Sequence, residues 1–146
     1  MDKEFLGIKM NHVVDFGIDC IKQLKQLDDD VIKKLYKNFI NPIKSGYTPD
    51  ELEGKYKPSW EMKFNSPIKD AFLELAKKEQ LHHYHFGYKF YKDGFDKKYF
   101  GKVSDGIIHL KQNELDTVVE HLIFDVCLEH PSPFKVPWDK SRVKAA

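Results

Sequence analysis

The sequence predicts an α+β domain, in which a small, mostly antiparallel β-sheet carries amphipathic helices on one face. Residues 81–92 and 118–129 alternate between apolar and polar side chains, as strands with one buried face do. Residues 28–43 and 66–79 carry apolar side chains at the three-and-four spacing of amphipathic helices. An apolar sheet face and two apolar helix stripes most naturally bury against each other.

Size and composition set further limits. The 146 residues are expected to form one domain, long enough to bury a core without disulfides or a structural metal. Cys20 and Cys127 lie in apolar-alternating runs, and we interpret them as reduced core residues of a cytoplasmic protein. The absence of an export signal and of a long apolar run also favours the cytoplasm and predicts no membrane partner. The net charge of +1 excludes a broadly basic nucleic-acid binder, so any basic surface is local.

The first half of the chain contains one clear helix. Residues 12–25 satisfy both strand and helix spacing, and the sequence leaves the two open. The helix predicted at residues 28–43 begins with three aspartates, which favour the positive end of the helix dipole. Ser45-Gly46 ends it. Residues 47–65, interrupted by proline and glycine, are predicted to be a loop.

The second half alternates helix, strand and turn. The helix at residues 66–79 opens with a serine cap and a proline at its first helical position. Three strands follow it, and a long aromatic and basic hairpin arm, residues 92–102, separates the first two. The strands are predicted at residues 81–92, 108–111 and 118–129, with Asn113-Glu114 as the turn before the third. The proline-rich tail from His130 is expected to lie extended against the sheet.

The predicted strands collect basic side chains on one face. In the first strand, Tyr84 and Phe86 fall on one side, and His83 and His85 fall on the other. If the three strands are neighbours, one uncovered surface carries His83, His85, Lys89, Tyr91, His109, Lys111 and His121, with Asp125 and Glu129 beside His121. We expect the chemistry of the protein on this surface.

Two chemistries fit these side chains. His83 and His85 project the same way from one strand, a spacing that zinc sites use, with His109 or His121 as a third ligand. Alternatively, the histidines and lysines of this surface supply what RNA cleavage without a metal requires. They offer a base for the 2′-hydroxyl proton, cations for the phosphate and an acid for the leaving oxygen. A solvated histidine-rich surface without chemistry is a third interpretation.

The arm, residues 92–102, has two interpretations of its own. Its aromatic rings and lysines suit stacking on RNA bases and contact with phosphates. They also suit a non-catalytic interaction module that docks a protein partner or a second copy of the chain, which would make a homo-oligomer.

Five short motifs follow one another along residues 39–136. They are Phe39-Ile-Asn-Pro-Ile-Lys-Ser-Gly-Tyr-Thr-Pro49, Glu53-Gly54-Lys55-Tyr56, His83-Tyr84-His85-Phe86, Asp105-Gly-Ile-Ile-His-Leu110, and Glu129-His130 with Phe134-Lys135 beyond it. In this order they resemble the YafO-type toxins of the RelE/ParE superfamily of bacterial toxin–antitoxin systems.

The resemblance implies a small antiparallel sheet with helices on one face. It also implies an mRNA-cleaving endoribonuclease that acts on the ribosome, needs no cofactor and is restrained by a cognate antitoxin. The implied catalytic residues are His83, His85, His109 and His130, and the implied substrate-binding residues are Lys89, Lys111 and Lys135. Tyr91, on the same strand face, is added to the predicted substrate-binding residues. The chain departs from the family pattern at the helix of residues 67–78, which looks like an insertion. Arg142 is its only arginine, so lysines must hold the phosphate as point charges.

Overall fold

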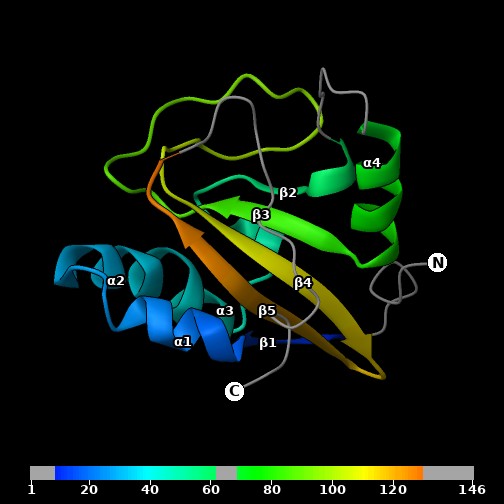
Figure 1. Ribbon diagram of the computed structural model, residues 1–146, viewed down its shortest axis with the longest axis horizontal. Coiled ribbons are helices and arrows are strands. Elements are labelled where there is room, and N and C mark those ends of the chain that lie inside the picture. Colours follow the sequence, from blue (N-terminus) through cyan, green and yellow to red (C-terminus); the bar gives the residue numbers. More distant parts are fainter. Residues whose placement is uncertain (1–8, 62–68, 130–146) are drawn as a thin grey trace.

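The computed structural model describes residues 9–61 and 69–129, which form a sheet of five strands in the order β1-β5-β4-β3-β2 (Figure 1). The strands are β1 (Asn11–Phe16), β2 (Tyr56–Pro58), β3 (Leu81–His85), β4 (Ile107–Leu115) and β5 (Val118–Cys127). β1 runs parallel to β5, and the other neighbouring strands are antiparallel. The predicted α+β class with a mostly antiparallel sheet is confirmed.

The helices follow the predicted pattern closely. They are α1 (Ile18–Leu24), α2 (Asp29–Leu35), a π-helical turn η1 (Tyr36–Ile40), α3 (Asn41–Lys44) and α4 (Lys69–Lys78), with short 3₁₀ turns η2 (Pro49–Glu51) and η3 (Ser59–Glu61). From α2 to α3 the helix is continuous, and it ends at Ser45 and Gly46, whose φ of 101° suits glycine. None of the helices in the described part of the chain has the length and apolar character that crossing a bilayer requires.

The main core lies between the sheet and the helices α1–α3. Phe39 and Ile43 of the helical layer face Tyr84 and Phe86 on the sheet side, and all four side chains are buried. Each such side chain contributes roughly 1.5–3 kcal/mol relative to an exposed position. The apolar face of the sheet is therefore the face that α1–α3 cover.

Helix α4 packs on the opposite face, at one end of β3. Its Ala76 joins Leu81 and Phe124 in a second apolar cluster, flanked by Trp60 and Phe72. The sequence predicted both helices on one face, and in this detail the prediction is wrong. An apolar stripe shows that a helix is buried, but it does not specify the face.

One strand carries an extra residue. In the pairing of β4 with β5, His109 is opposite Asp125 and Leu110 is opposite Ile123, so Phe124 forms a β-bulge. Because of the bulge, Asp125 shares a face with His109, whereas Ile123 joins the core under the helices. The strict alternation predicted for residues 118–129 is broken at this point.

Several strand boundaries differ from the prediction. β3 ends at His85, and β4 continues to Leu115, so that the turn falls at Asp116-Thr117 instead of Asn113-Glu114. Residues 12–25 form the end of strand β1 and then helix α1, so each of the two structures that the sequence left open is present in part. β2 lies inside the predicted loop. The tail from His130 lies outside the described residues.

Tyr84 provides a test of how the helical layer is tied to the sheet. Its buried hydroxyl donates to Asn38 O at 2.8 Å and accepts from Gly54 N at 3.1 Å. Tyr84→Phe leaves both backbone groups without this partner, and we expect the free energy of unfolding to fall by about 1–3 kcal/mol in urea denaturation. The exposed Tyr47 is the matched control, since Tyr47→Phe removes a hydroxyl from the surface. Equal stability of the two variants would contradict the role of this hydroxyl.

Candidate active site

A pocket of about 270 Å³ lies on the face of the sheet opposite α1–α3. Its lining residues are Lys55, Lys57, His83, His85, Lys92, Val103, Ser104 and Asp105. β3 supplies the two histidines, the β2 region supplies two lysines, and the arm with the residues after it supplies the rest. Three lysines and two histidines therefore line one hollow, with Asp105 as the one acidic residue among its lining residues.

The two histidines of β3 are held in fixed orientations. His83 Nδ1 lies 3.1 Å from Ser59 Oγ, and His85 Nδ1 lies 2.8 Å from the carbonyl oxygen of Ser104. The ring centroids are 6.0 Å apart. The predicted strand parity is confirmed, but the prediction of an uncovered surface is wrong. His83 and His85 are only 1% and 4% exposed because η3 and the segment around Ser104 fold over them.

A half-buried carboxylate of the arm, that of Asp96, binds two of the lysines. Asp96 accepts a hydrogen bond from Lys57 Nζ at 2.6 Å and lies 3.7 Å from Lys55 Nζ. The hydrogen bond from Lys57 holds the pKa of Asp96 well below its usual range. Burial, and then repulsion from Lys57, lowers the pKa of Lys55. A further anion in the pocket would relieve that repulsion, so the lysines favour an anionic ligand.

The predicted site residues fall into two groups. His109 is paired with His83 across β3 and β4 and lies on the same face, but it is fully buried and does not line the pocket. Lys111 lies further along β4, where its ammonium group binds the Glu79 carboxylate at 2.7 Å. Of the predicted catalytic residues within the described part of the chain, only His83 and His85 reach the pocket.

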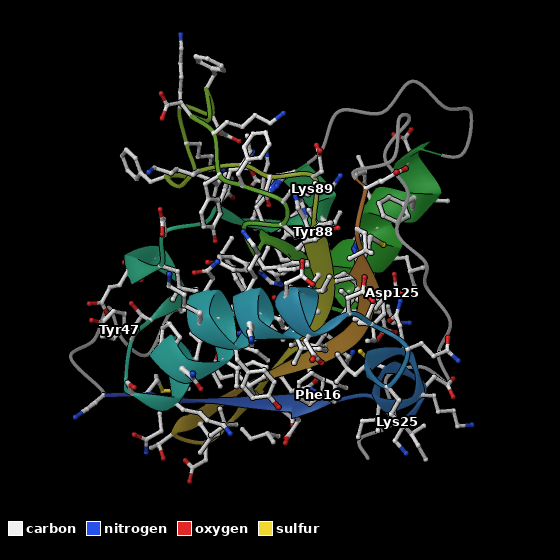
Figure 2. All side chains as sticks on the ribbon, turned by 90° about the vertical axis from the view of Figure 1, so that its left-hand side faces the viewer. Phe16, Lys25, Tyr47, Tyr88, Lys89 and Asp125 are labelled. Atoms are coloured by element: carbon white, nitrogen blue, oxygen red, sulfur yellow. The ribbon has the colours of Figure 1, made fainter. Side chains whose placement is uncertain are left out.

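The remaining predicted residues lie elsewhere. Lys89 is exposed beside α2, where Lys34 Nζ donates to its carbonyl oxygen (Figure 2). The Tyr91 hydroxyl donates to His85 O at 3.0 Å and lies 3.2 Å from the Tyr84 hydroxyl, so it supports the backbone of β3. His130 and Lys135 lie outside the described residues.

The sequence did not point to the lysines of the pocket. Lys55 directly precedes β2 and Lys57 lies within it, and a strand of three residues is too short to give a clear period. The alternation Lys55-Tyr56-Lys57, with one basic and one aromatic face, is the signal that could have found them.

His121 lies on the opposite face from His83 and His85. Its Nδ1 is 2.8 Å from the Tyr56 hydroxyl, and its Nε2 is 2.9 Å from His12 Nδ1. A zinc site built from His83, His85 and His121 is therefore excluded, because the sheet separates the ligands. Asp125 also faces away from His121 and cannot orient it.

His121 and His82 form part of a second, buried histidine group under the helices. Burial, with the nearby charge of His12, lowers the pKa of His121 to about 3. Burial lowers the pKa of His82, which contacts the rings of Tyr56 and Trp60, to about 4. Both imidazoles are neutral in the folded protein near pH 7.

Comparisons of the chain with protein-family models, with curated proteins and with solved structures gave no match. The resemblance to the YafO-type toxins thus rests on the motifs of the sequence. The chemistry of the pocket has to be inferred from its own geometry.

The lowered pKa values of His82 and His121 predict that the free energy of unfolding falls in acid. Above a pH of about 6.5 they are neutral in both the folded and the unfolded chain. Below it the unfolded chain binds protons that the fold rejects, which costs about 1.4 kcal/mol per pH unit and histidine. The contribution of His82 to this loss stops growing near pH 4, and that of His121 near pH 3, because each imidazole is then protonated in the folded chain as well. Urea denaturation between pH 7 and 4.5 should show the decline.

His121→Gln tests how much of the fall in the free energy of unfolding is due to His121. It removes one of the two groups, so the decline of the free energy of unfolding per pH unit should be about halved. An unchanged slope in this variant would show that His121 takes up its proton equally well in the folded chain.

Proposed function

We propose that the protein is a toxin-type endoribonuclease that cleaves mRNA with His83 and His85, on a phosphate held by Lys55, Lys57 and Lys92. The observation that carries the proposal is the pocket of about 270 Å³, which two oriented histidines and three lysines line, with one acidic residue, Asp105, beside them. This set of groups matches the needs of phosphodiester cleavage by general acid and base. The motif resemblance adds the ribosome as the place of cleavage and a cognate antitoxin as a partner.

The chemical step needs only groups of the chain and of the RNA. One imidazole, in its neutral form, takes the proton of the ribose 2′-hydroxyl as the 2′-oxygen bonds to phosphorus. The bond from phosphorus to the 5′-oxygen breaks, and the other imidazole, as the imidazolium, protonates that oxygen. The products are a 2′,3′-cyclic phosphate and a 5′-hydroxyl. Each proton transfer by a positioned group accelerates such a reaction by roughly 10²–10⁴-fold.

The lysines stabilise the charge that develops on the phosphate. Lys57 is held by Asp96, so its position is fixed before the substrate arrives. Lys55 lies beside it, and Lys92 reaches the pocket from the arm. An ammonium group acts as a point charge without the two-pronged geometry of arginine, so three of them share this task.

The test compares pocket variants in growth and cleavage assays. Expression of the wild-type chain should arrest growth and cut mRNA, whereas His83→Ala and His85→Ala should each lower the cleavage rate by at least 100-fold. Lys57→Gln should weaken RNA binding and leave the fold intact in circular dichroism. Lys89→Gln changes an exposed lysine that does not line the pocket and should behave like the wild type. A wild-type chain that neither arrests growth nor cleaves RNA would refute the enzyme proposal.

The exposed rings of the arm favour a second candidate function. Phe95 and Phe100 are 93% and 87% exposed, which is unusual for large apolar side chains in a folded domain. Lys97 and Lys98 lie between them in the sequence. This composition fits a protein partner that offers acidic and apolar side chains, and docking it would require no catalysis.

The second candidate is tested with the product of the neighbouring reading frame as the probe. Phe95→Ser with Phe100→Ser should weaken its binding more than tenfold, since exposed aromatic anchors dominate such interfaces. His83→Ala with His85→Ala should bind it like the wild type. Tyr47→Ser is the control, because Tyr47 is exposed on the loop after α3, away from the arm (Figure 2). Equal binding by all variants would exclude the arm as the docking site.

A further inference from the structure

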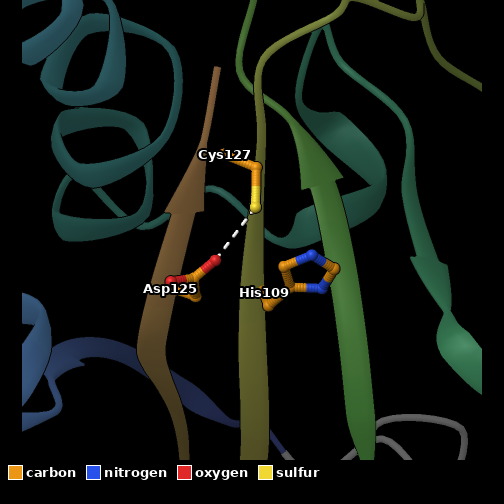
Figure 3. A group of neighbouring side chains, drawn as sticks. All are labelled: His109, Asp125 and Cys127. Carbon is orange, nitrogen blue, oxygen red and sulfur yellow. Dashed lines mark hydrogen bonds between the residues drawn. The ribbon is translucent and has the colours of Figure 1, made fainter. Parts of the chain in front are cut away.

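A second group of donor atoms, drawn in Figure 3, lies on the face of the sheet that carries the pocket, because its His109 pairs with the pocket residue His83. His109 of β4 and Asp125 and Cys127 of β5 bring an imidazole nitrogen, a carboxylate oxygen and a sulfur within 4.8 Å of one another. None of the three lines the pocket, so the group is separate from the proposed RNA site.

The backbone holds these three side chains together. His109 is directly opposite Asp125 in the antiparallel pair, and Cys127 follows two residues later on the same face. The bulge at Phe124 is what turns Asp125 and Cys127 to the side of His109. All three side chains are short, so few rotatable bonds separate the donor atoms from the strands.

The surroundings of the group are suited to a cation. His109 and Asp125 are 0% and 7% exposed, whereas Cys127 is half-buried and gives access from outside. Cys127 Sγ donates to Asp125 Oδ2 at 2.9 Å (Figure 3). A buried carboxylate beside a thiol gains from a cation that binds both, because the cation replaces the thiol proton and neutralises the charge.

The donor types select the metal. Calcium and magnesium prefer oxygen ligands throughout. Zinc accepts nitrogen, oxygen and sulfur together, at bond lengths of about 2.0–2.3 Å in a tetrahedron. Such a tetrahedron places its ligand atoms about 3.3–3.8 Å apart. The donors already lie within 4.8 Å, so small rotations of the side chains close the site.

We propose that His109, Asp125 and Cys127 form a zinc-binding site, with water at the fourth position. Binding breaks the hydrogen bond between Cys127 and Asp125, releases the thiol proton to solvent and forms bonds from the metal to nitrogen, oxygen and thiolate. The metal links β4 to β5 across the bulge and so stabilises the sheet under the pocket. The site shares only His109 with the zinc sites that the sequence suggested.

The experiment is a cobalt titration of the full chain under reducing conditions. Cobalt(II) in this site should give a thiolate-to-metal charge-transfer band with a stoichiometry of one, and zinc should displace it. Cys127→Ser should abolish the band, and Asp125→Asn should weaken binding at least tenfold. Cys20, the other cysteine, is buried under the helices, so Cys20→Ala is the matched control and should keep the band.

A second readout guards against misfolded variants. Zinc should raise the midpoint of thermal unfolding of the wild type and of Cys20→Ala, but not of Cys127→Ser, with circular dichroism confirming that each variant folds. The double variant His83→Ala with His85→Ala should bind cobalt like the wild type, so the metal-binding result does not depend on RNA cleavage. A wild-type chain without the band, or a band that survives Cys127→Ser, would overturn the proposal.

Discussion

A single extra residue in β5 decides which side chains of that strand reach which face of the sheet. With Phe124 bulged, Asp125 and Cys127 join His109, whereas His121 turns under the helices toward Tyr56. A regular strand would have placed His121 and Asp125 on one face. The bulge therefore separates His121, which lies in the core, from Asp125 and Cys127, which lie beside His109. The separation of His82 from His83 follows from the regular alternation of β3.

The face of the sheet that carries the pocket has polar side chains that are largely buried and that form hydrogen bonds or ion pairs. Buried imidazoles and ammonium groups lose their hydration, so each one needs a hydrogen bond or an opposite charge. Ser59 and Ser104 provide it for the histidines, and Asp96 provides it for two lysines. The same contacts restrict the orientations of the groups, which is what a site that stabilises developing charge requires.

The fold was largely predictable from the sequence because it depends on long periodic patterns. The helix at residues 28–43 and the parity of His83 and His85 are of this kind, and both are observed. The face chosen by α4 was not predictable, because an apolar stripe fits either side of a sheet. The bulge at Phe124 was not predictable either, because Phe124 ends a run of consecutive apolar residues in which the sequence does not show an extra residue.

The candidate site was predictable only in part. The two β3 histidines emerged from alternation, but their burial depends on η3 and on Ser104, which are distant in the sequence. The pocket lysine Lys55 directly precedes β2 and Lys57 lies within it, and this strand of three residues is too short to show a period. Lys111 lies on the predicted face, but Glu79 binds its ammonium group away from the pocket, and Lys89 lies beyond the end of β3.

The ion pairs of Asp96 join the arm to the pocket in a way that reaches beyond local stability. Asp96 follows Phe95, the most exposed large apolar side chain of the described residues, directly in the sequence. Any force that draws this tip away from the body also withdraws a carboxylate from Lys55 and Lys57 and leaves their charges uncompensated. If a partner bound to Phe95 displaces Asp96, the affinity of the tip for that partner and the affinity of the pocket for anions are thermodynamically coupled, and the coupling is reciprocal.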